Sequence, residues 1–234
     1  LEKAKQVAES LLRSREKLML TISHDIRAPL SSIIGYIELL LRRHPDERQQ
    51  YYLENMKGSS DHILSLVNDL LDFQRLESGE MEVHSVPFRV PVLFDEIYTS
   101  FQPIAEAKGL RFVLNLKPEE TGQVYMGDPI RIRQVVGNLL SNAIKFTPRG
   151  GRVVVTMECV GSMLVTHVAD TGCGIAEEDL PHIFKAFYLG ETGGAGTMGT
   201  GIGLSLVRQM VRSMEGRVSV KSTAGVGSEF VVML

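Results

Sequence analysis

A histidine followed directly by a carboxylate is the first feature of the sequence that could do chemistry. His24 and Asp25 stand in the segment SHDIRAPL, between the apolar residues Ile22 and Ile26. At about 100° per residue, His24 falls on the side of a helix opposite Ile22, where another domain can reach it. A neutral imidazole is a nucleophile near neutral pH, and the carboxylate could orient it and take its proton. An isolated histidine of this kind is usually only surface, which is how the other five histidines are interpreted.

Two asparagines and a lysine lie at helical spacing in the segment GDPIRIRQVVGNLLSNAIKFTPRGG. Asn138 and Asn142 are four residues apart and share one face of a helix, and Lys145 follows nearly one turn later. Amide oxygens are hard ligands that suit Mg²⁺, and an ammonium suits phosphate oxygens. Buried asparagines can instead bond to neighbouring backbone, but two of them on an otherwise apolar face favour a ligand site.

Three later segments could approach a nucleotide. In DTGCGI, a β-rich run delivers Asp170 into a turn with Gly172 and Gly174, where the carboxylate could accept from an adenine amino group. In IFKAFYLG, Phe184 and Phe187 could pack the base of a loop or could simply belong to the core. In GTGIGL, glycine-rich backbone opens a helix, as phosphate cradles do. That last segment comprises Gly199, Thr200, Gly201, Ile202, Gly203 and Leu204. Each motif alone is weak, whereas their order and spacing together are specific.

The apolar pattern of residues 1–77 predicts two long helices that would present the histidine. The stripe of the first helix is Leu12, Met19, Ile22, Ile26, Leu30, Ile33, Ile37 and Leu40. His44-Pro45-Asp46 breaks the pattern, which then resumes from Leu53 to Leu70. Pro29 lies inside the first helix at a usual cost of about 3 kcal/mol, and a kink there would loosen the helix around the histidine. Because two helices cannot bury so much apolar surface alone, we expect a dimer that forms a four-helix bundle.

Beyond a candidate hinge at residues 77–80, short strands alternate with helices. We expect strands over 111–116, 152–157, 163–168, 217–221 and 229–233, and helices over 92–108, 129–145 and 202–214. This alternation predicts an α/β sandwich with a mixed sheet. The expected fold is therefore a helical domain over residues 1–78 followed by an α/β domain over residues 79–234.

The composition excludes several classes of function. The 234 residues carry a net charge of -3 with no broad basic field, so we expect no nucleic-acid partner. Cys159 and Cys173 form neither a CxxC pair nor a metal cluster, which suits a reducing compartment. No apolar run has the length of a membrane span, and the chain begins inside a helical pattern. We expect a cytoplasmic location, with any membrane attachment made by segments outside this chain.

Taken together, these segments resemble the sensor histidine kinases of two-component signalling. SHDIRAPL is similar to their phosphoacceptor box, and the predicted hairpin is similar to their dimerisation domain. The four later segments resemble the N, G1, F and G2 boxes of their ATP-binding domain, in the superfamily that includes gyrase and the heat-shock chaperones. The resemblance covers nearly the whole chain from about Glu16. It implies autophosphorylation of His24 with Asp25 as the base, followed by transfer to an aspartate of a response regulator. It also implies ATP and Mg²⁺ as cofactors and a homodimer.

The resemblance assigns a role to each site residue. Asn142 would coordinate Mg²⁺, Asn138 would help position the reacting centre, Lys145 would meet phosphate, and Asp170 would bind adenine. Phe187 and the glycines of DTGCGI and GTGIGL complete the expected ATP site. Gyrase-like ATPases place a glutamate base for water where Asn138 lies, and an amide cannot activate water in that way. An ATPase switch remains an alternative that SHDIRAPL argues against. A dimerisation module with a dead nucleotide site is another, which the intact boxes oppose.

Two features depart from the family pattern. The loop between Lys185 and Arg208 contains no lysine or arginine but has seven glycines from Gly190 to Gly203, so we expect a mobile lid and modest ATP affinity. Ala28 lies four residues after His24, where the family uses a threonine or asparagine to hold the water of the phosphatase reaction. Because a methyl group offers no hydrogen bond, we expect weak phosphatase activity.

Overall fold

The computed structural model describes residues 25–78, 81–116, 124–161, 163–190 and 201–234. Three predicted site residues, His24, Gly199 and Thr200, and most of the expected lid lie outside these ranges. The chain divides into two compact units, one ending at Met81 and the other running from Glu82 to Leu234. In the described part of the chain, no helix is both long and apolar enough to cross a membrane.

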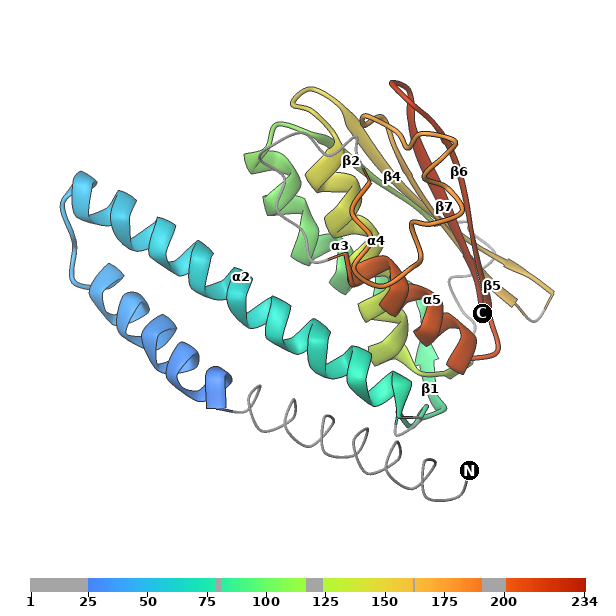
Figure 1. Cartoon of the computed structure of the whole chain (residues 1–234), viewed down its shortest axis with the longest axis horizontal. Helices are drawn as coiled ribbons and strands as arrows, with labels where there is room; N and C mark the ends of the chain where they lie inside the picture. Colours follow the sequence, from blue (N-terminus) through green and yellow to red (C-terminus); the bar gives the residue numbers. More distant parts are fainter. Residues whose placement is uncertain (1–24, 79–80, 117–123, 162, 191–200) are drawn as a thin grey trace, which may run out of the picture. The chain divides into compact units, whose positions relative to one another are not determined.

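The first unit is the predicted helical hairpin, whose two arms are drawn in blue and cyan in Figure 1. Its first helix covers residues 25–41 and continues through Pro29, and its second, α2, is Glu47–Glu77. Asp46 starts α2 with a capping box: its carboxylate accepts from Gln49 N at 2.8 Å, and the Gln49 side chain accepts from Asp46 N at 3.2 Å. This reciprocal cap explains why the helical pattern resumes directly after the break.

Much of the apolar stripe of the hairpin remains exposed. Leu30 and Ile37 are buried, but Ile26, Ile33 and Leu40 are 39%, 45% and 53% exposed. On α2, the exposed large apolar residues are Tyr51, Tyr52, Met56 and Ile63. Exposed apolar surface of this extent is typical of a face that another protein surface covers, and the dimer stays a prediction.

The second unit is the predicted α/β domain with a mixed sheet. Its elements are β1 (Val86–Arg89), α3 (Val90–Ala107), β2 (Arg111–Leu116), β3 (Val124–Gly127), α4 (Pro129–Phe146), β4 (Arg152–Val160), β5 (Met163–Asp170), α5 (Gly203–Ser213), β6 (Arg217–Thr223) and β7 (Gly227–Met233). The main sheet has the order β2-β4-β5-β7-β6, in which β2 and β4 are parallel and the other pairs antiparallel. A separate two-stranded ribbon, β1-β3, is antiparallel.

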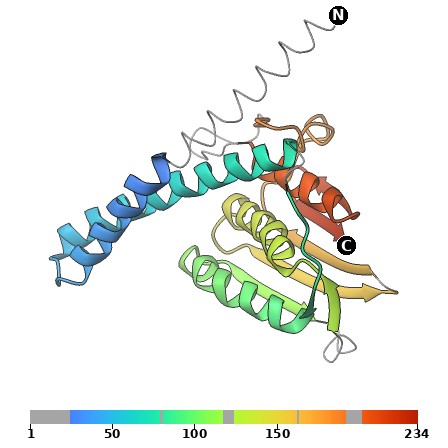
Figure 2. The same cartoon turned by 90° about the horizontal axis from the view of Figure 1, so that it is seen from below.

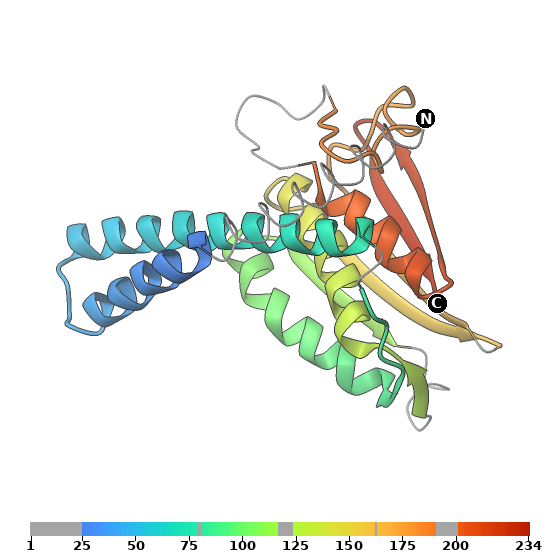
Figure 3. The same cartoon turned by 60° about the horizontal axis from the view of Figure 1, so that its bottom comes forward.

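Helices α3, α4 and α5 lie on the same face of the main sheet (Figures 2 and 3). The core fills the space between these layers. Val153, Val155 and Met157 alternate along β4 toward the helices and are at most 1% exposed. Val135, Leu139 and Leu140 of α4 are equally buried. Burial of each such side chain stabilises the fold by roughly 1.5–3 kcal/mol, so α4 is held firmly against the sheet.

Candidate functional site

Helix α4 carries the two predicted asparagines above this core. Asn138 and Asn142 are half-buried, on a helix whose other inward side chains are apolar. The Asn138 Nδ2 atom is buried and has no hydrogen-bond partner among the described residues. An unsatisfied buried donor costs about 1–3 kcal/mol, which a bound ligand or water that accepts from it would offset. The Nδ2 atom of Asn138 can therefore donate a hydrogen bond to a ligand or to water.

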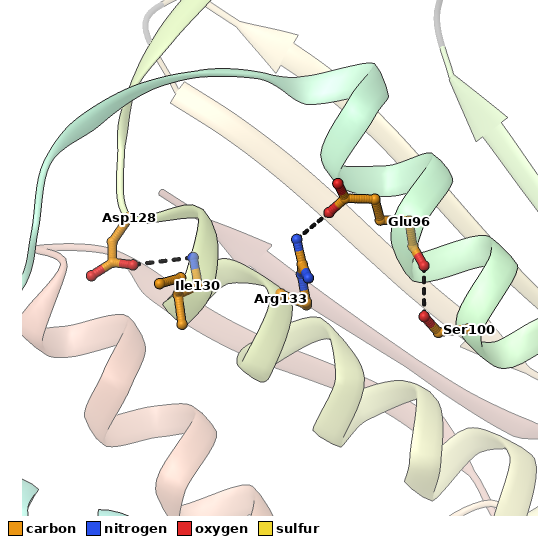
Figure 4. Close-up of polar contacts among 5 residues, drawn as sticks. All are labelled: Glu96, Ser100, Asp128, Ile130 and Arg133. Atoms are coloured by element: carbon orange, nitrogen blue, oxygen red, sulfur yellow. Dashed lines mark hydrogen bonds and ion pairs between the residues drawn. The ribbon is translucent and has the colours of Figure 1, made fainter.

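The N-terminus of α4 is fixed by a buried carboxylate (Figure 4). Asp128, 4% exposed, accepts through Oδ1 from Ile130 N at 3.1 Å and Arg131 N at 3.0 Å. Its Oδ2 accepts from His84 N at 3.0 Å, which ties the segment before β1 to the start of the helix. Farther along, an Arg133–Glu96 ion pair joins α4 to α3, as Figure 4 shows. Together these contacts set the direction in which α4 presents its asparagines.

The C-terminal turn of α4 carries the predicted phosphate ligand. Lys145 is half-buried, and burial lowers the pKa of its ammonium. Its Nζ lies 5.1 Å from the centroid of the Phe146 ring. The fully buried Thr147 then ends the helix, since its Oγ1 donates to Ala143 O at 2.6 Å. A partly desolvated ammonium is stabilised by a nearby anion, as a phosphate would provide.

Asp170 is the last residue of β5, at the mouth of the turn predicted to bind adenine. Its Oδ1 accepts from Gly172 N at 2.8 Å. Burial raises the pKa of Asp170, and hydrogen bonds from the backbone N–H groups of Gly172 and Ser228 oppose that rise. These two bonds fix the orientation of a carboxylate that can still accept from a ligand, because an ionised carboxylate has about four acceptor positions.

The glycines of DTGCGI are required by close packing. A Cβ on Gly172 would lie 2.7 Å from both Asp170 Oδ1 and Phe146 O. Gly174 has φ +67°, and a Cβ there would lie 2.0 Å from Thr223 O. Between them, Cys173 N donates to Phe146 O at 3.3 Å, which ties this turn to the end of α4. Backbone hydrogen bonds therefore connect the turn that holds Asp170 to the end of α4, which carries Lys145.

The residues that support this turn from behind were not predicted from the sequence. Ser222 Oγ accepts from Ile175 N at 2.8 Å and donates to Gly227 O at 2.9 Å. Gly225 N donates to Cys173 O at 2.7 Å. These residues belong to the β6–β7 hairpin, about 50 positions later in the chain. Small residues at both strand ends, in STAGVGS, are the signal that could have marked this hairpin as a packing partner.

The two phenylalanines of IFKAFYLG have different environments. Phe184 meets Phe230 edge-on with ring centroids 6.4 Å apart, and the Arg208 guanidinium lies 5.7 Å from its ring. Phe187 is 59% exposed and has φ +64°, and its N–H donates to Gly201 O at 3.0 Å. Of the two interpretations left open by the sequence, core packing describes Phe184. Phe187 instead stands at the surface, joined to the start of the glycine-rich segment.

That segment leads into α5 without a side-chain cap. Gly201 has φ +69°, and a Cβ there would lie 2.8 Å from Tyr188 O. Ile202 is buried at the N-cap position, where its apolar side chain makes no capping hydrogen bond, and the helix begins with Gly203 and Leu204. One turn later, Arg208 Nε is buried without a partner in the described part of the chain. Backbone N–H groups at a helix start favour an anion, and the Arg208 guanidinium adds a positive charge on the same helix.

No protein cluster of the usual metal-binding kind accompanies this site. Among the described residues, no group of three or more His, Cys, Asp or Glu side chains could hold a metal ion. The donor that α4 offers is the amide of Asn142, which is the hard oxygen type preferred by Mg²⁺ when phosphates supply further ligands. The residues therefore fit an ion that arrives with a nucleotide.

In the hairpin, the described part of the phosphoacceptor segment begins with the exposed residue Asp25. Arg27 Nη2 donates to Asn68 Oδ1 at 2.7 Å and thereby joins the first helix to α2. Ala28 is exposed on the surface of the helix, so a ligand could approach it freely. Residues 25–29 are thus exposed on the helix surface, and the Arg27–Asn68 hydrogen bond connects them to α2.

Comparison with protein families divides the chain in the same way. Residues 14–79 match the model of the His Kinase A (phospho-acceptor) domain. Residues 127–234 match the model described as histidine kinase-, DNA gyrase B-, and HSP90-like ATPase. The second match contains every nucleotide-site residue discussed above.

Curated relatives match along nearly the whole chain. The sensor protein GacS of Pseudomonas syringae pv. syringae is 35% identical over 239 residues, which cover 100% of this chain and 26% of GacS. The autoinducer 2 sensor kinase/phosphatase LuxQ of Vibrio cholerae is 35% identical over 235 residues, which cover 99% of this chain and 27% of LuxQ. BarA of Escherichia coli, a signal transduction histidine-protein kinase, is 33% identical over 235 residues, which cover 98% of this chain and 26% of BarA. The chain thus spans about a quarter of the length of these relatives.

Solved structures show the same likeness. Full-length ShkA in complex with AMPPNP superposes with a TM-score of 0.74 at 32% identity, over 93% of this chain and 45% of ShkA. The catalytic domain of the histidine kinase ThkA superposes with a TM-score of 0.55 at 26% identity, over 66% of this chain and 95% of that domain.

Proposed function

Because the chain belongs to the sensor histidine kinases, as a phosphoacceptor hairpin joined to an ATPase-type domain, we propose that it transfers the γ-phosphate of ATP to His24. The phosphate then passes to an aspartate of a response regulator. The observation that carries the proposal is the set of polar groups on α4 and on the neighbouring end of β5. It combines an Asn138 amide whose Nδ2 has no partner among the described residues, a partly desolvated Lys145 and an oriented carboxylate at Asp170.

In this proposal, the end of β5 recognises the base. The ionised Asp170 accepts a hydrogen bond from the adenine amino group, and Gly172 and Gly174 keep side chains out of the space that the ring needs. Guanine carries an oxygen at the equivalent ring position, and an ionised carboxylate would repel it. The site therefore selects ATP over GTP.

Helices α4 and α5 hold the phosphates. Lys145 and the backbone N–H groups at the start of α5 meet phosphate oxygens, and Asn138 donates a hydrogen bond to the phosphoryl group that is transferred. Asn142 would hold Mg²⁺, which supplies charge neutralisation on the phosphate oxygens when it is bound. The lid segment has no cation of its own, so we assign Arg208, on α5 just beyond it, as the additional positive group.

The chemical step is an in-line displacement. A ring nitrogen of His24 forms a bond to the γ-phosphorus while the bond from that phosphorus to the bridging oxygen breaks, and ADP leaves. The ring proton passes to Asp25, the adjacent carboxylate. An amide at position 138 cannot deprotonate water, which directs the phosphate to histidine instead of to hydrolysis.

The assembly follows from the hairpin. We assign the exposed apolar residues of both helices, among them Ile33 and Met56, to a homodimer interface that completes a four-helix bundle. A response regulator would dock on the helix surface around His24. LuxQ is named as a phosphatase as well as a kinase, but Ala28 removes the polar group expected for that reaction. We therefore propose weak phosphatase activity here.

The test is to incubate the protein with γ-labelled ATP and Mg²⁺ and to examine the labelled protein. We expect label that is released by acid and retained in alkali, as for phosphohistidine. Free phosphate released in many turnovers without labelled protein would instead indicate a gyrase-like ATPase and would overturn the proposal.

A further inference from the structure

Lys108, at the end of α3, has no role in the proposed reaction, yet its side chain reaches the last turn of α4. Lys108 is the C-cap residue of α3. Gly109, with φ +71°, turns the chain away, and Leu110 N donates back to Ala105 O at 2.9 Å. This glycine-based termination satisfies the end of α3 through backbone alone. The Lys108 side chain is therefore not needed to cap its own helix.

The Lys108 ammonium caps a different helix. Its Nζ donates to Ile144 O at 2.6 Å and to Lys145 O at 2.7 Å, the carbonyls of the last turn of α4. The C-terminus of a helix carries partial negative charge from such carbonyls, and a cation there is stabilising. Both bonds are partly shielded from water, which strengthens them.

Backbone hydrogen bonds connect the last turn of α4 to Asp170, the carboxylate that we assign to adenine binding. The residue after Lys145 is Phe146, whose carbonyl accepts from Cys173 N at 3.3 Å. Cys173 follows Gly172, whose N–H orients Asp170 at 2.8 Å. Lys108 therefore lies at the start of a chain of contacts that includes the phosphate lysine and the adenine acceptor.

Two backbone bonds keep Lys108 itself in place. Gly150 N donates to Gly109 O at 3.0 Å, and Arg111 N donates to Gly151 O at 2.9 Å. The end of α3 and the loop after α4 are thus joined on both sides of the lysine. Because the backbone of Lys108 is held in this way, its ammonium can restrict the movement of the Ile144 and Lys145 carbonyls.

We propose that Lys108 is a positioning residue of the nucleotide site, which holds the last turn of α4, and with it Lys145 and the Phe146–Cys173 link, in the geometry that binds ATP. The inference rests on the proposed function, because it assigns nucleotide binding to α4 and Asp170. Lys108 touches neither substrate nor reacting atoms in this scheme. Its removal should weaken nucleotide binding while leaving the rate of the chemical step at saturating ATP intact.

The experiment compares Lys108→Met, which keeps the length of the side chain without its donors, with Lys108→Arg, which keeps the charge and the donors. Lys221→Met is the matched control, since Lys221 is exposed on β6 in the same unit. Calorimetry gives the Kd for Mg-ATP, autophosphorylation gives KM and kcat, and circular dichroism verifies that each variant is folded at the assay temperature.

We expect Lys108→Met to raise Kd and KM about tenfold, the equivalent of losing one good interaction, with kcat within about twofold of the parent. Lys108→Arg should recover most of the affinity, and Lys221→Met should match the parent. Parental affinity in folded Lys108→Met would overturn the inference alone, as would equal losses in Lys108→Arg and Lys108→Met. Absence of affinity in the parent protein would overturn the proposed function and this inference with it. If Lys108→Met does not fold, Lys108→Gln, which keeps one donor, gives the same comparison.

Discussion

The two units of the chain are incomplete in opposite ways. The hairpin leaves apolar residues such as Ile33 and Met56 in water, 45% and 54% exposed. The α/β unit buries its apolar core but contains buried polar atoms, such as Asn138 Nδ2 and Arg208 Nε, that have no hydrogen-bond partner in the described part of the chain. An exposed apolar stripe is completed by another protein surface, whereas buried polar atoms are completed by a small, highly charged ligand. The difference separates an assembly module from a ligand-binding module.

The largest effect should come from a charge in the hairpin stripe. Ile33→Asp would place one carboxylate from each protomer in the proposed dimer interface, where the loss of hydration and their like charge oppose association. We expect the dimer dissociation constant to rise by more than about 100-fold, measured by analytical ultracentrifugation. Ser31→Asp is the control, since residue 31 lies on another face of the same helix. Unchanged dimerisation of Ile33→Asp would show that this stripe is not the interface.

The corresponding change in the ligand-binding module is Asn142→Ala. It removes the amide oxygen assigned to Mg²⁺, so we expect the affinity for Mg-ATP to fall at least about tenfold. The dimer should be unaffected, because α4 belongs to the other unit. Calorimetry with and without EDTA is the measurement. If the variant and the parent bind Mg-ATP equally, the metal assignment is wrong.

The pH dependence of binding should follow Asp170. Burial raises its pKa in the folded protein above the ordinary value of 3.8, and the ionised carboxylate is a stronger hydrogen-bond acceptor for the adenine amino group than the protonated group. ATP affinity should therefore decline as the pH falls through that raised pKa. The stability of the nucleotide-free protein should follow the opposite trend, since the raised pKa favours the fold at low pH and disfavours it as the group ionises. Asp170→Asn should bind weakly at every pH, and an unchanged pH profile in this variant would exclude Asp170 as the titrating group.

A smaller effect of opposite sign is expected at Asn138. Replacement by leucine, which has a similar shape, removes a buried donor that has no partner among the described residues. We expect the nucleotide-free protein to be stabilised by about 1 kcal/mol in urea unfolding, while autophosphorylation is lost. Asn115→Leu, on the exposed edge of β2, is the control. Destabilisation of Asn138→Leu would mean that the amide is satisfied within the protein.

The sequence predicted the elements whose patterns are local. The predicted limits of β2 are those observed, and α4 differs by one residue, because apolar periodicity and Pro129 define it. Strands β1 and β3 were missed because each has only four residues and β1 contains Pro87, which argues against a strand. Helical spacing also placed Asn138 and Asn142 on one half-buried helix.

The supporting contacts of the site were not predictable in the same way. Asp128 holds a segment 44 positions earlier, and Lys108 reaches carbonyls 36 and 37 positions later. Such pairs depend on how the elements pack, and nothing in a local window of sequence marks them. The motif residues could be found because their spacing is local, whereas the residues that orient them became apparent only in three dimensions.

The central claim is that His24 receives the phosphate and the α/β unit binds the nucleotide. The most direct test is His24→Ala, in which calorimetric affinity for Mg-ATP and acid-labile labelling from γ-labelled ATP are measured on the same preparation. Because the histidine and the nucleotide residues belong to separate units, we predict affinity within about twofold of the parent and no label. Retention of acid-labile label in this variant would contradict the claim.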